Sequence, residues 1–248
     1  MNELTINGRF QGPDHMGNGG YVAGLLARPL GNQAQVRLHR PAPLDKPLPW
    51  RQSVNGHVRL WSNGRLLAEA SPVFLGLSVP APPPYTAVLA AQQEATYGHD
   101  HPFPDCFVCG PNRPHGDGLG LRPTYLPDYN LVAATWLPHE SLANNSGLVA
   151  SEYLWAALDC PGGLAAVWPR PRPILLGQIT ARVAAGIRPG ERCLVLGWPI
   201  SRQGRKHIVG SALLNENGQV FGRARAVWIE PDPFRSAART EPSVNRLI

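Results

Sequence analysis

Two stretches of the sequence decide the fold: HVRLWSNGRLLAEASPVFLG at residues 57–76 and GSALLNENGQVFGRARAVWIE at residues 210–230. In both, a strand-like run leads into a turn containing Asn and Gly, and a second run follows in which large and small residues alternate. Gly64 and Gly218 supply the positive φ that a tight hairpin turn requires. The repetition therefore predicts one antiparallel hairpin in each half of the chain.

The repetition extends outward from both hairpins. Residues 34–50 match residues 177–193, because each stretch contains a strand, a charged connection with Pro or Gly, and another strand. A helix candidate precedes each stretch, at residues 19–30 (GGYVAGLLARPL) and at residues 150–160 (ASEYLWAALDC). A single apolar helix is buried only where a sheet face covers it. Each half is therefore predicted to be a curled antiparallel sheet around one central helix, which is an α+β fold.

The predicted division of the chain follows from this symmetry. Residues 1–80 form the first unit and residues 121–232 the second. Residues 81–120 form a connection, in which a Pro-rich run breaks regular structure and TAVLAAQQEA predicts a short helix. Residues 233–248 lack apolar periodicity and are predicted to be a flexible tail.

Composition excludes several classes of function. The chain has 248 residues, a formal net charge of +6 and no N-terminal signal pattern. No run reaches the roughly 18 apolar residues of a membrane span, so we expect a cytoplasmic protein with reduced cysteines and neither a membrane nor a nucleic-acid partner. The Gly-rich stretch at residues 17–20 lacks the Lys-Ser/Thr of a phosphate-binding loop, which argues against nucleotide hydrolysis.

Three short motifs resemble a known family. HMGNGGYVAGLLA, HPFPDCFVCG and LDCPGG, together with the repeated order of elements, are similar to double hotdog proteins of the acyl-CoA thioesterase-like superfamily. The resemblance covers most of residues 8–230. It implies two hotdog units in one chain, and hydrolysis of an acyl-CoA or acyl-carrier thioester without a cofactor. Hydratases, dehydratases and non-catalytic acyl-binding proteins share the fold, so these alternatives stay open.

The resemblance also assigns candidate site residues. Thioester hydrolysis needs a base or nucleophile and donors that stabilise the oxyanion. In hotdog thioesterases a helix carboxylate fills the first role, and Asp159 matches it at the end of a helix that Pro161-Gly162-Gly163 is expected to stop. Backbone amides at a helix N-terminus fill the second role. The matching substrate-binding residues are Asn18, Gly19, Gly20 and Tyr21.

The acidic residues predict one active site per chain. Residues 19–30 contain no Asp or Glu, whereas residues 150–160 contain Glu152 and Asp159. The Gly-rich turn of the first half is thus expected to face the acidic helix of the second. Glu152 lies near the helix start, where its charge favours the helix dipole, and is not expected to be catalytic. The alternative for Asp159 is a structural hydrogen bond to amides of the turn that follows it.

Two polar residues in the next strand are candidate supporting groups. Gln178 and Thr180 are two residues apart and so lie on the same face of the sheet. The resemblance implies that a Thr and a Gln help the carboxylate to orient water. Gln35 occupies the equivalent position in the first half, which fits a structural role for Gln178 equally well.

The cysteines suggest half of a metal site. Cys106 and Cys109 form a C-x-x-C pair, and the nearby histidines are His99, His101 and His115. A second C-x-x-C pair is missing from the sequence, so a structural turn is favoured over zinc and the predicted site contains no metal. Cys160 and Cys193 are isolated in apolar contexts, which predicts small buried hydrophobes.

Two further expectations concern chemistry and assembly. In hotdog dehydratases a His and a carboxylate share the elimination chemistry, so His15 with Asp159 is the basis of the hydratase alternative. Open edge strands favour side-by-side association, which makes a homodimer compatible with the sequence. A basic surface would suit the phosphates of CoA.

Overall fold

The structure, a computed structural model, describes residues 2–31, 33–98 and 100–232, and the predicted tail lies outside these residues. In this part of the chain, 11 strands form one continuous sheet in which every paired neighbour is antiparallel. Their order across the sheet is β1 (Asn2–Thr5), β3 (Pro47–Gln52), β4 (Val58–Ser62), β5 (Arg65–Ser71), β2 (Gln33–Leu38), β8 (Leu175–Val183), β11 (Val220–Ile229), β10 (Lys206–Asn215), β9 (Cys193–Gln203), β7 (Leu131–Trp136) and β6 (Thr124–Leu126).

The strand order is mirrored about the pair β2–β8. From the outside inward, the first half reads β1-β3-β4-β5-β2 and the second reads β7-β9-β10-β11-β8, with β6 added at its edge. Val36 lies opposite Ile179 where the halves join. Gly64 and Gly218 have φ of 72° and 80° in the turns of the two repeated hairpins. The predicted repetition is confirmed, and it forms a single sheet rather than two separate ones.

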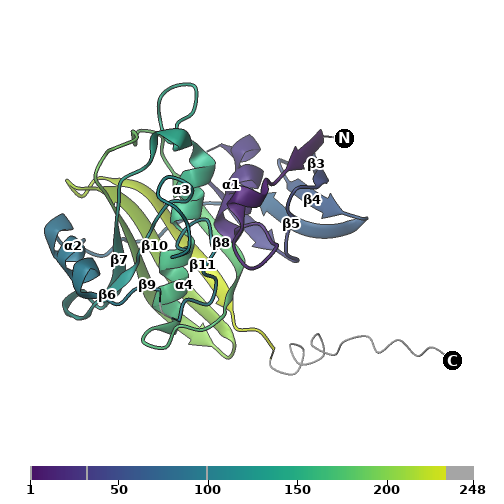
Figure 1. Ribbon diagram of the computed structural model, residues 1–248. Helices are drawn as coiled ribbons and strands as arrows, with labels where there is room; N and C mark the ends of the chain where they lie inside the picture. The colour runs from purple at the N-terminus through teal and green to yellow at the C-terminus, as the bar shows by residue number, and fades with distance from the viewer. Residues whose placement is uncertain (1, 32, 99, 233–248) are drawn as a thin grey trace.

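Three helices cover one face of this sheet (Figure 1). They are α1 (Gly19–Ala27), α3 (Ser151–Ala157) and α4 (Cys160–Val167). α1 and α3 run antiparallel and approach each other closely, because glycines of α1 face α3. A Cβ at Gly20 would lie 2.9 Å from the Trp155 carbonyl oxygen, and one at Gly24 would lie 2.6 Å from Glu152 Cα.

The second-half helix does not stop at Pro161-Gly162-Gly163, and that prediction is wrong. α3 ends at Ala157 and α4 begins at Cys160, with Asp159 as the residue before its first turn. Proline is compatible with the start of a helix, because its missing N–H would have no helical acceptor there. Glycine is required by packing, since a Cβ at Gly163 would lie 2.8 Å from Trp228 Cη2. Asp159 therefore lies at the junction of two helices that the sheet covers.

The connection contains the predicted helix and also an unexpected core segment. α2 (Tyr85–Glu94) packs on the opposite face of the sheet from α4, and its Val88 is fully buried. Farther along, Phe107 is fully buried and its N–H donates to the Gln11 carbonyl (2.7 Å). The C-x-x-C turn therefore belongs to the main core rather than to the surface.

No helix of the residues that the structure describes is both long and apolar enough to cross a membrane.

The close approach of α1 to α3 predicts a strong effect of one added methyl group. We expect Gly24→Ala to lower the free energy of unfolding by about 1–3 kcal/mol, because its Cβ would collide with the backbone of α3. Gly76→Ala is the matched control, since its nearest neighbour would be 3.7 Å away. Chemical denaturation measures both variants, and equal stabilities would contradict the packing argument.

Candidate active site

Asp159 is a buried carboxylate that joins the two halves of the molecule. Its side chain is held between the helices of both units, and the residue is 2% exposed. Its Oδ2 accepts a hydrogen bond from the Gly20 N–H (2.9 Å) and another from Asn18 Nδ2 (2.9 Å). The expected meeting of the Gly-rich turn with the acidic helix is thus observed. The structural alternative placed a hydrogen bond between the Asp159 side chain and the amides that follow it. The structure shows no such capping bond from Asp159 to α4.

Local sequence explains why the N-terminus of α1 receives this carboxylate. Asn18 caps the helix, because its Oδ1 accepts from the Tyr21 N–H (2.9 Å) while its Nδ2 points to Asp159. Gly20 lacks a side chain where a Cβ would lie 2.6 Å from Asp159 Cβ. The helix N-terminus carries partial positive charge, which favours an anion at this position.

The second oxygen of Asp159 differs from the first in its surroundings. Oδ1 is buried and forms no hydrogen bond to any residue that the structure describes. Burial raises the pKa of Asp159 to about 7, against the opposing effects of the hydrogen bonds from Gly20 and Asn18. The carboxyl group therefore has one oxygen fixed by α1 and one buried oxygen without a donor among the described residues.

A largely apolar cavity of about 300 Å³ adjoins this carboxyl group. Asp159, Asn18 and Gly19 belong to its lining. Apolar lining residues from both halves include Met16, Leu38, Ile174, Leu176 and Trp228. An apolar cavity with a few polar groups is typical of a small-molecule site.

One further polar group at this cavity was not predicted. The indole Nε1 of Trp228 is buried without a hydrogen-bond partner among the described residues, and Trp228 lines the cavity. A buried donor and a buried acceptor, Asp159 Oδ1, thus belong to the same lining. In the sequence Trp228 is one of several aromatic residues in strands, so no pattern singles it out.

The other predicted binding residues have different environments. Gly19 is the first residue of α1, so its amide has no acceptor within the helix, and it lines the cavity. The Tyr21 amide is engaged by Asn18. The Tyr21 ring stacks on Phe10 with centroids 3.9 Å apart, inside an aromatic cluster.

Gln178 and Thr180 are not brought to Asp159. In β8, Ile179 and Ala181 are fully buried in the core beneath the helices, so the alternate residues Gln178 and Thr180 lie on the opposite face. There both side chains donate to Gln35 Oε1, at 3.1 and 3.4 Å. Their supporting role stays a prediction from the resemblance alone.

The two other titratable residues considered from the sequence, His15 and Glu152, do not lie beside Asp159. His15 is exposed and is not among the residues that line the cavity. Glu152 pairs with Arg28 at the other end of α3 (Oε1 to Nη1, 3.5 Å).

Three of the four cysteines come together beside Asp159. The Sγ atoms of Cys106, Cys109 and Cys160 all lie within 4.8 Å of one another. The prediction that Cys160 is isolated is therefore wrong, because the buried C-x-x-C turn packs against the start of α4. Cys193 lies in β9 and does not belong to this group.

The mirrored sheet with central helices from both halves is the double hotdog fold. Solved structures with thioesterase names align over nearly the whole chain. A putative thioesterase from Novosphingobium aromaticivorans has a TM-score of 0.61 and 15% identity, and the alignment covers 93% of this chain and 95% of that one. The acyl-CoA thioesterase II TesB2 from Mycobacterium marinum has a TM-score of 0.59 and 13% identity, with 93% of each chain covered.

A tesB protein from Mycobacterium avium subs paratuberculosis is similar to the same extent, with a TM-score of 0.59, 12% identity and coverage of 93% and 92%. A scan of protein-family models finds no match to this sequence, and neither does a search of curated proteins. At these identities the likeness establishes the fold, and this chain therefore has the double hotdog architecture of thioesterase-like proteins.

Asn18 is expected to contribute to stability in two separable ways. We predict that Asn18→Ala lowers the free energy of unfolding by about 2–3 kcal/mol, because it removes both the helix cap and a donor to a buried carboxyl group. Asn18→Ser keeps a cap oxygen and should recover about 1 kcal/mol. Thermal or denaturant unfolding measures both variants. Equal losses for Ala and Ser would show that the cap contributes nothing.

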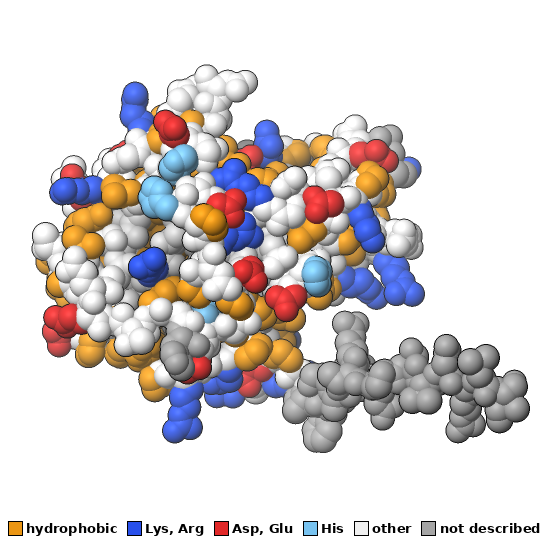
Figure 2. All heavy atoms as spheres, in the orientation of Figure 1, with side chains coloured by type: hydrophobic (Ala, Val, Ile, Leu, Met, Phe, Trp, Pro, Cys, Tyr) orange, Lys and Arg blue, Asp and Glu red, His pale blue; other side chains and the backbone are white. Residues whose placement is uncertain are grey.

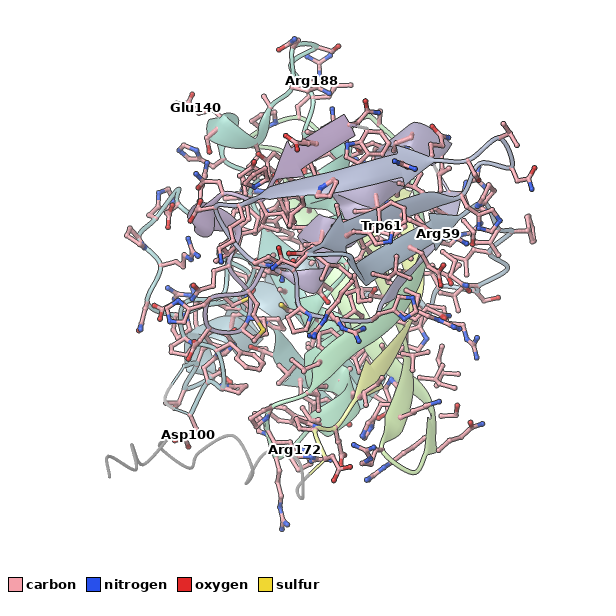
Figure 3. All side chains as sticks on the ribbon, turned by 90° about the vertical axis from the view of Figure 1, so that its right-hand side faces the viewer. Arg59, Trp61, Asp100, Glu140, Arg172 and Arg188 are labelled. Carbon is pink, nitrogen blue, oxygen red and sulfur yellow. The ribbon has the colours of Figure 1, made fainter. Side chains whose placement is uncertain are left out.

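A second carboxylate, Glu230, has a strongly ionic environment. Its Oε1 accepts from Arg172 (2.6 Å), His207 (2.7 Å) and Arg202 (3.3 Å), and Arg172 lies at the lower end of the sheet in Figure 3. The hydrogen bond from Arg172, followed by that from His207, lowers the pKa of Glu230 to about 2.

The depressed pKa of Glu230 predicts a pH-dependent contribution to stability. We expect Glu230→Gln to lose on the order of 1 kcal/mol at pH 7, a value reduced for the partial exposure of the side chain. A lowered folded pKa stabilises the protein above the unfolded pKa, and this contribution disappears as the pH falls. The difference between variant and wild type should therefore shrink from about pH 5 toward pH 2. A pH-independent difference in urea unfolding would contradict this.

Proposed function

We propose that this protein hydrolyses the thioester of an acyl-CoA or an acyl carrier, with Asp159 as general base or nucleophile. The observation that carries the proposal is the meeting of Asp159 from the second half with the N-terminus of α1 from the first half, at an apolar cavity. The double hotdog fold of thioesterase-like structures supports the same reaction class.

In the proposed reaction, Asp159 acts through Oδ1, because Oδ2 is engaged by Gly20 and Asn18. When substrate opens the cavity, Oδ1 takes a proton from water as the water oxygen attacks the carbonyl carbon. The C–S bond then breaks, and the departing thiolate receives that proton. Alternatively, Oδ1 attacks the carbonyl carbon directly, and the C–S bond breaks as the thiolate departs. Water then hydrolyses the resulting anhydride to the free acid and Asp159, and the proton released goes to the thiolate.

The N-terminus of α1 supplies the electrostatic stabilisation in this proposal. The Gly19 amide has no helical acceptor and belongs to the cavity lining, so it is the proposed oxyanion donor. Gly20 and Asn18 hold the carboxylate, and Tyr21 fixes Asn18 through its amide. Gln178 and Thr180 have no part in this scheme, since they lie on the other face of the sheet.

Two exposed arginines suggest how a CoA group would be recognised. Arg40 and Arg205 belong to the cavity lining and are exposed. Basic and acidic side chains are interspersed over the face drawn in Figure 2, so the argument depends on these two arginines rather than on the overall charge. We propose that they bind the phosphates of CoA. A cytoplasmic location and a homodimer remain part of this proposal.

The hydratase alternative has less support from the site. It required His15 beside Asp159, whereas His15 is exposed outside the cavity lining. A non-catalytic acyl-binding protein would use the same cavity without turnover, and the experiment below separates it from an enzyme.

We expect wild-type protein to release free CoA from at least one member of a panel of short, long, branched and aromatic acyl-CoAs. Asp159→Asn should lower the rate by at least about 100-fold while the fold is kept. Chromatographic measurement of free CoA avoids reagents that would modify the protein thiols. Glu152→Gln is the matched control, because Glu152 is an acidic residue of α3 that pairs with Arg28 away from Asp159. This variant should retain activity.

Other outcomes identify the alternatives. Consumption of an unsaturated acyl-CoA without free CoA would indicate a hydratase. Binding of acyl-CoA without turnover, unaffected by Asp159→Asn, would indicate an acyl-binding protein. Equal CoA release by wild type and Asp159→Asn would exclude Asp159 as the catalyst.

A further inference from the structure

The strongest unexplained feature of the interior is the group of three thiols. Cys106 and Cys109 come from the buried turn, and Cys160 is the first residue of α4. All three are free cysteines, and Sγ of Cys106 lies 3.7 Å from Sγ of Cys160. The proposed hydrolysis uses none of these sulfur atoms, so their convergence requires a separate explanation.

The spacing of the sulfur atoms fits a tetrahedral metal ion. Zinc binds thiolates at about 2.3 Å in tetrahedral geometry, which places two sulfur ligands about 3.8 Å apart. The observed Cys106–Cys160 separation is 3.7 Å, and the third sulfur lies within 4.8 Å of both. A packing role alone would favour apolar contacts with carbon atoms, whereas here three sulfur atoms face one another.

The C-x-x-C turn is built to hold Cys106 in place. The Gly110 N–H donates to the carbonyl of Cys106 (2.8 Å), and Asn18 Nδ2 lies 3.8 Å from its sulfur. Only glycine fits at position 110, because a Cβ there would lie 2.5 Å from the Cys106 nitrogen. Polar contacts outside the ligands themselves orient metal-binding side chains in this way.

We propose that Cys106, Cys109 and Cys160 bind one zinc ion through three thiolates. Soft thiolate ligands in a tetrahedral arrangement select zinc among the common divalent cations. No other His, Cys, Asp or Glu of the described residues belongs to this group, so the fourth position is left to an exchangeable ligand such as water.

A zinc ion at this position would join the segment that connects the two halves, residues 81–120, to the start of α4 beside Asp159. Cys106 and Cys160 line the same cavity as Asp159, whereas Cys109 and Cys160 line a second cavity of about 80 Å³. Asn18 Nδ2 lies 3.8 Å from Cys106 Sγ and also binds Asp159. The ion would thus fix the C-x-x-C turn against the start of α4, next to the carboxylate but separate from its chemistry.

Metal content tests the proposal without any assay of activity. Protein expressed in zinc-supplemented medium and purified under reducing conditions should contain about one zinc per chain by elemental mass spectrometry. Cys106→Ser, Cys109→Ser and Cys160→Ser should each lower this content at least about tenfold. Cys193→Ser is the matched control, because Cys193 is a buried cysteine outside the group, and it should keep its zinc.

A measurement on the wild-type chain covers the case in which a variant fails to fold. After removal of zinc with a chelator, Co²⁺ should restore a complex with thiolate-to-cobalt charge-transfer absorption and the strong visible bands of tetrahedral cobalt. Wild-type protein that lacks zinc and shows no such absorption would overturn the proposal. Equal loss of zinc in Cys193→Ser, or a Cys106–Cys160 disulfide in reduced, zinc-supplied protein, would also overturn it.

Discussion

The approach of α1 to α3 at Gly20 and Gly24 is the constraint on which the centre of the molecule depends. At these positions even a methyl group would meet the backbone or Cβ of the neighbouring helix segment. The close contact allows an amide of the first half to reach a carboxylate of the second half (2.9 Å). It also brings the first turn of α1 against the junction between α3 and α4, where the cavity lies. The site is therefore a product of helix packing, and the sheet supports it from one side.

The two buried carboxylate oxygens of Asp159 differ in their hydrogen bonding. One oxygen receives two hydrogen bonds from α1, and the other receives none from the described residues. A fully satisfied carboxylate would be a structural group, whereas a half-satisfied one keeps a buried acceptor at the edge of a cavity. Such an arrangement costs stability in the absence of a ligand, which is common at functional sites.

The sequence predicted the repeated hairpins and the facing of the Gly-rich turn toward Asp159, because both depend on local patterns that recur. It did not predict α4, since Pro161 and two glycines are typical both of a helix stop and of a tightly packed helix start. The position of Cys160 beside Cys106 depends on a long-range contact that spacing along the chain does not reveal. For Gln178 and Thr180 a signal was present: the alternation of Ile179, Ala181 and Val183 identifies the core-facing side of the strand, and the two polar residues lie on the other.

The antiparallel pair of helices has two ends, and they carry different charges. At one end, the N-terminus of α1 meets the buried Asp159, and at the other Arg28 and Glu152 form a partly exposed ion pair (3.5 Å). In a symmetric dimer of separate hotdog chains, every substitution would appear at both ends at once. Fusion of two units in one chain removes that restriction. The residues at one end can then change to bind a ligand, while those at the other end form an ion pair that joins the two halves. The two equivalent ends of the duplicated fold can therefore have different functions.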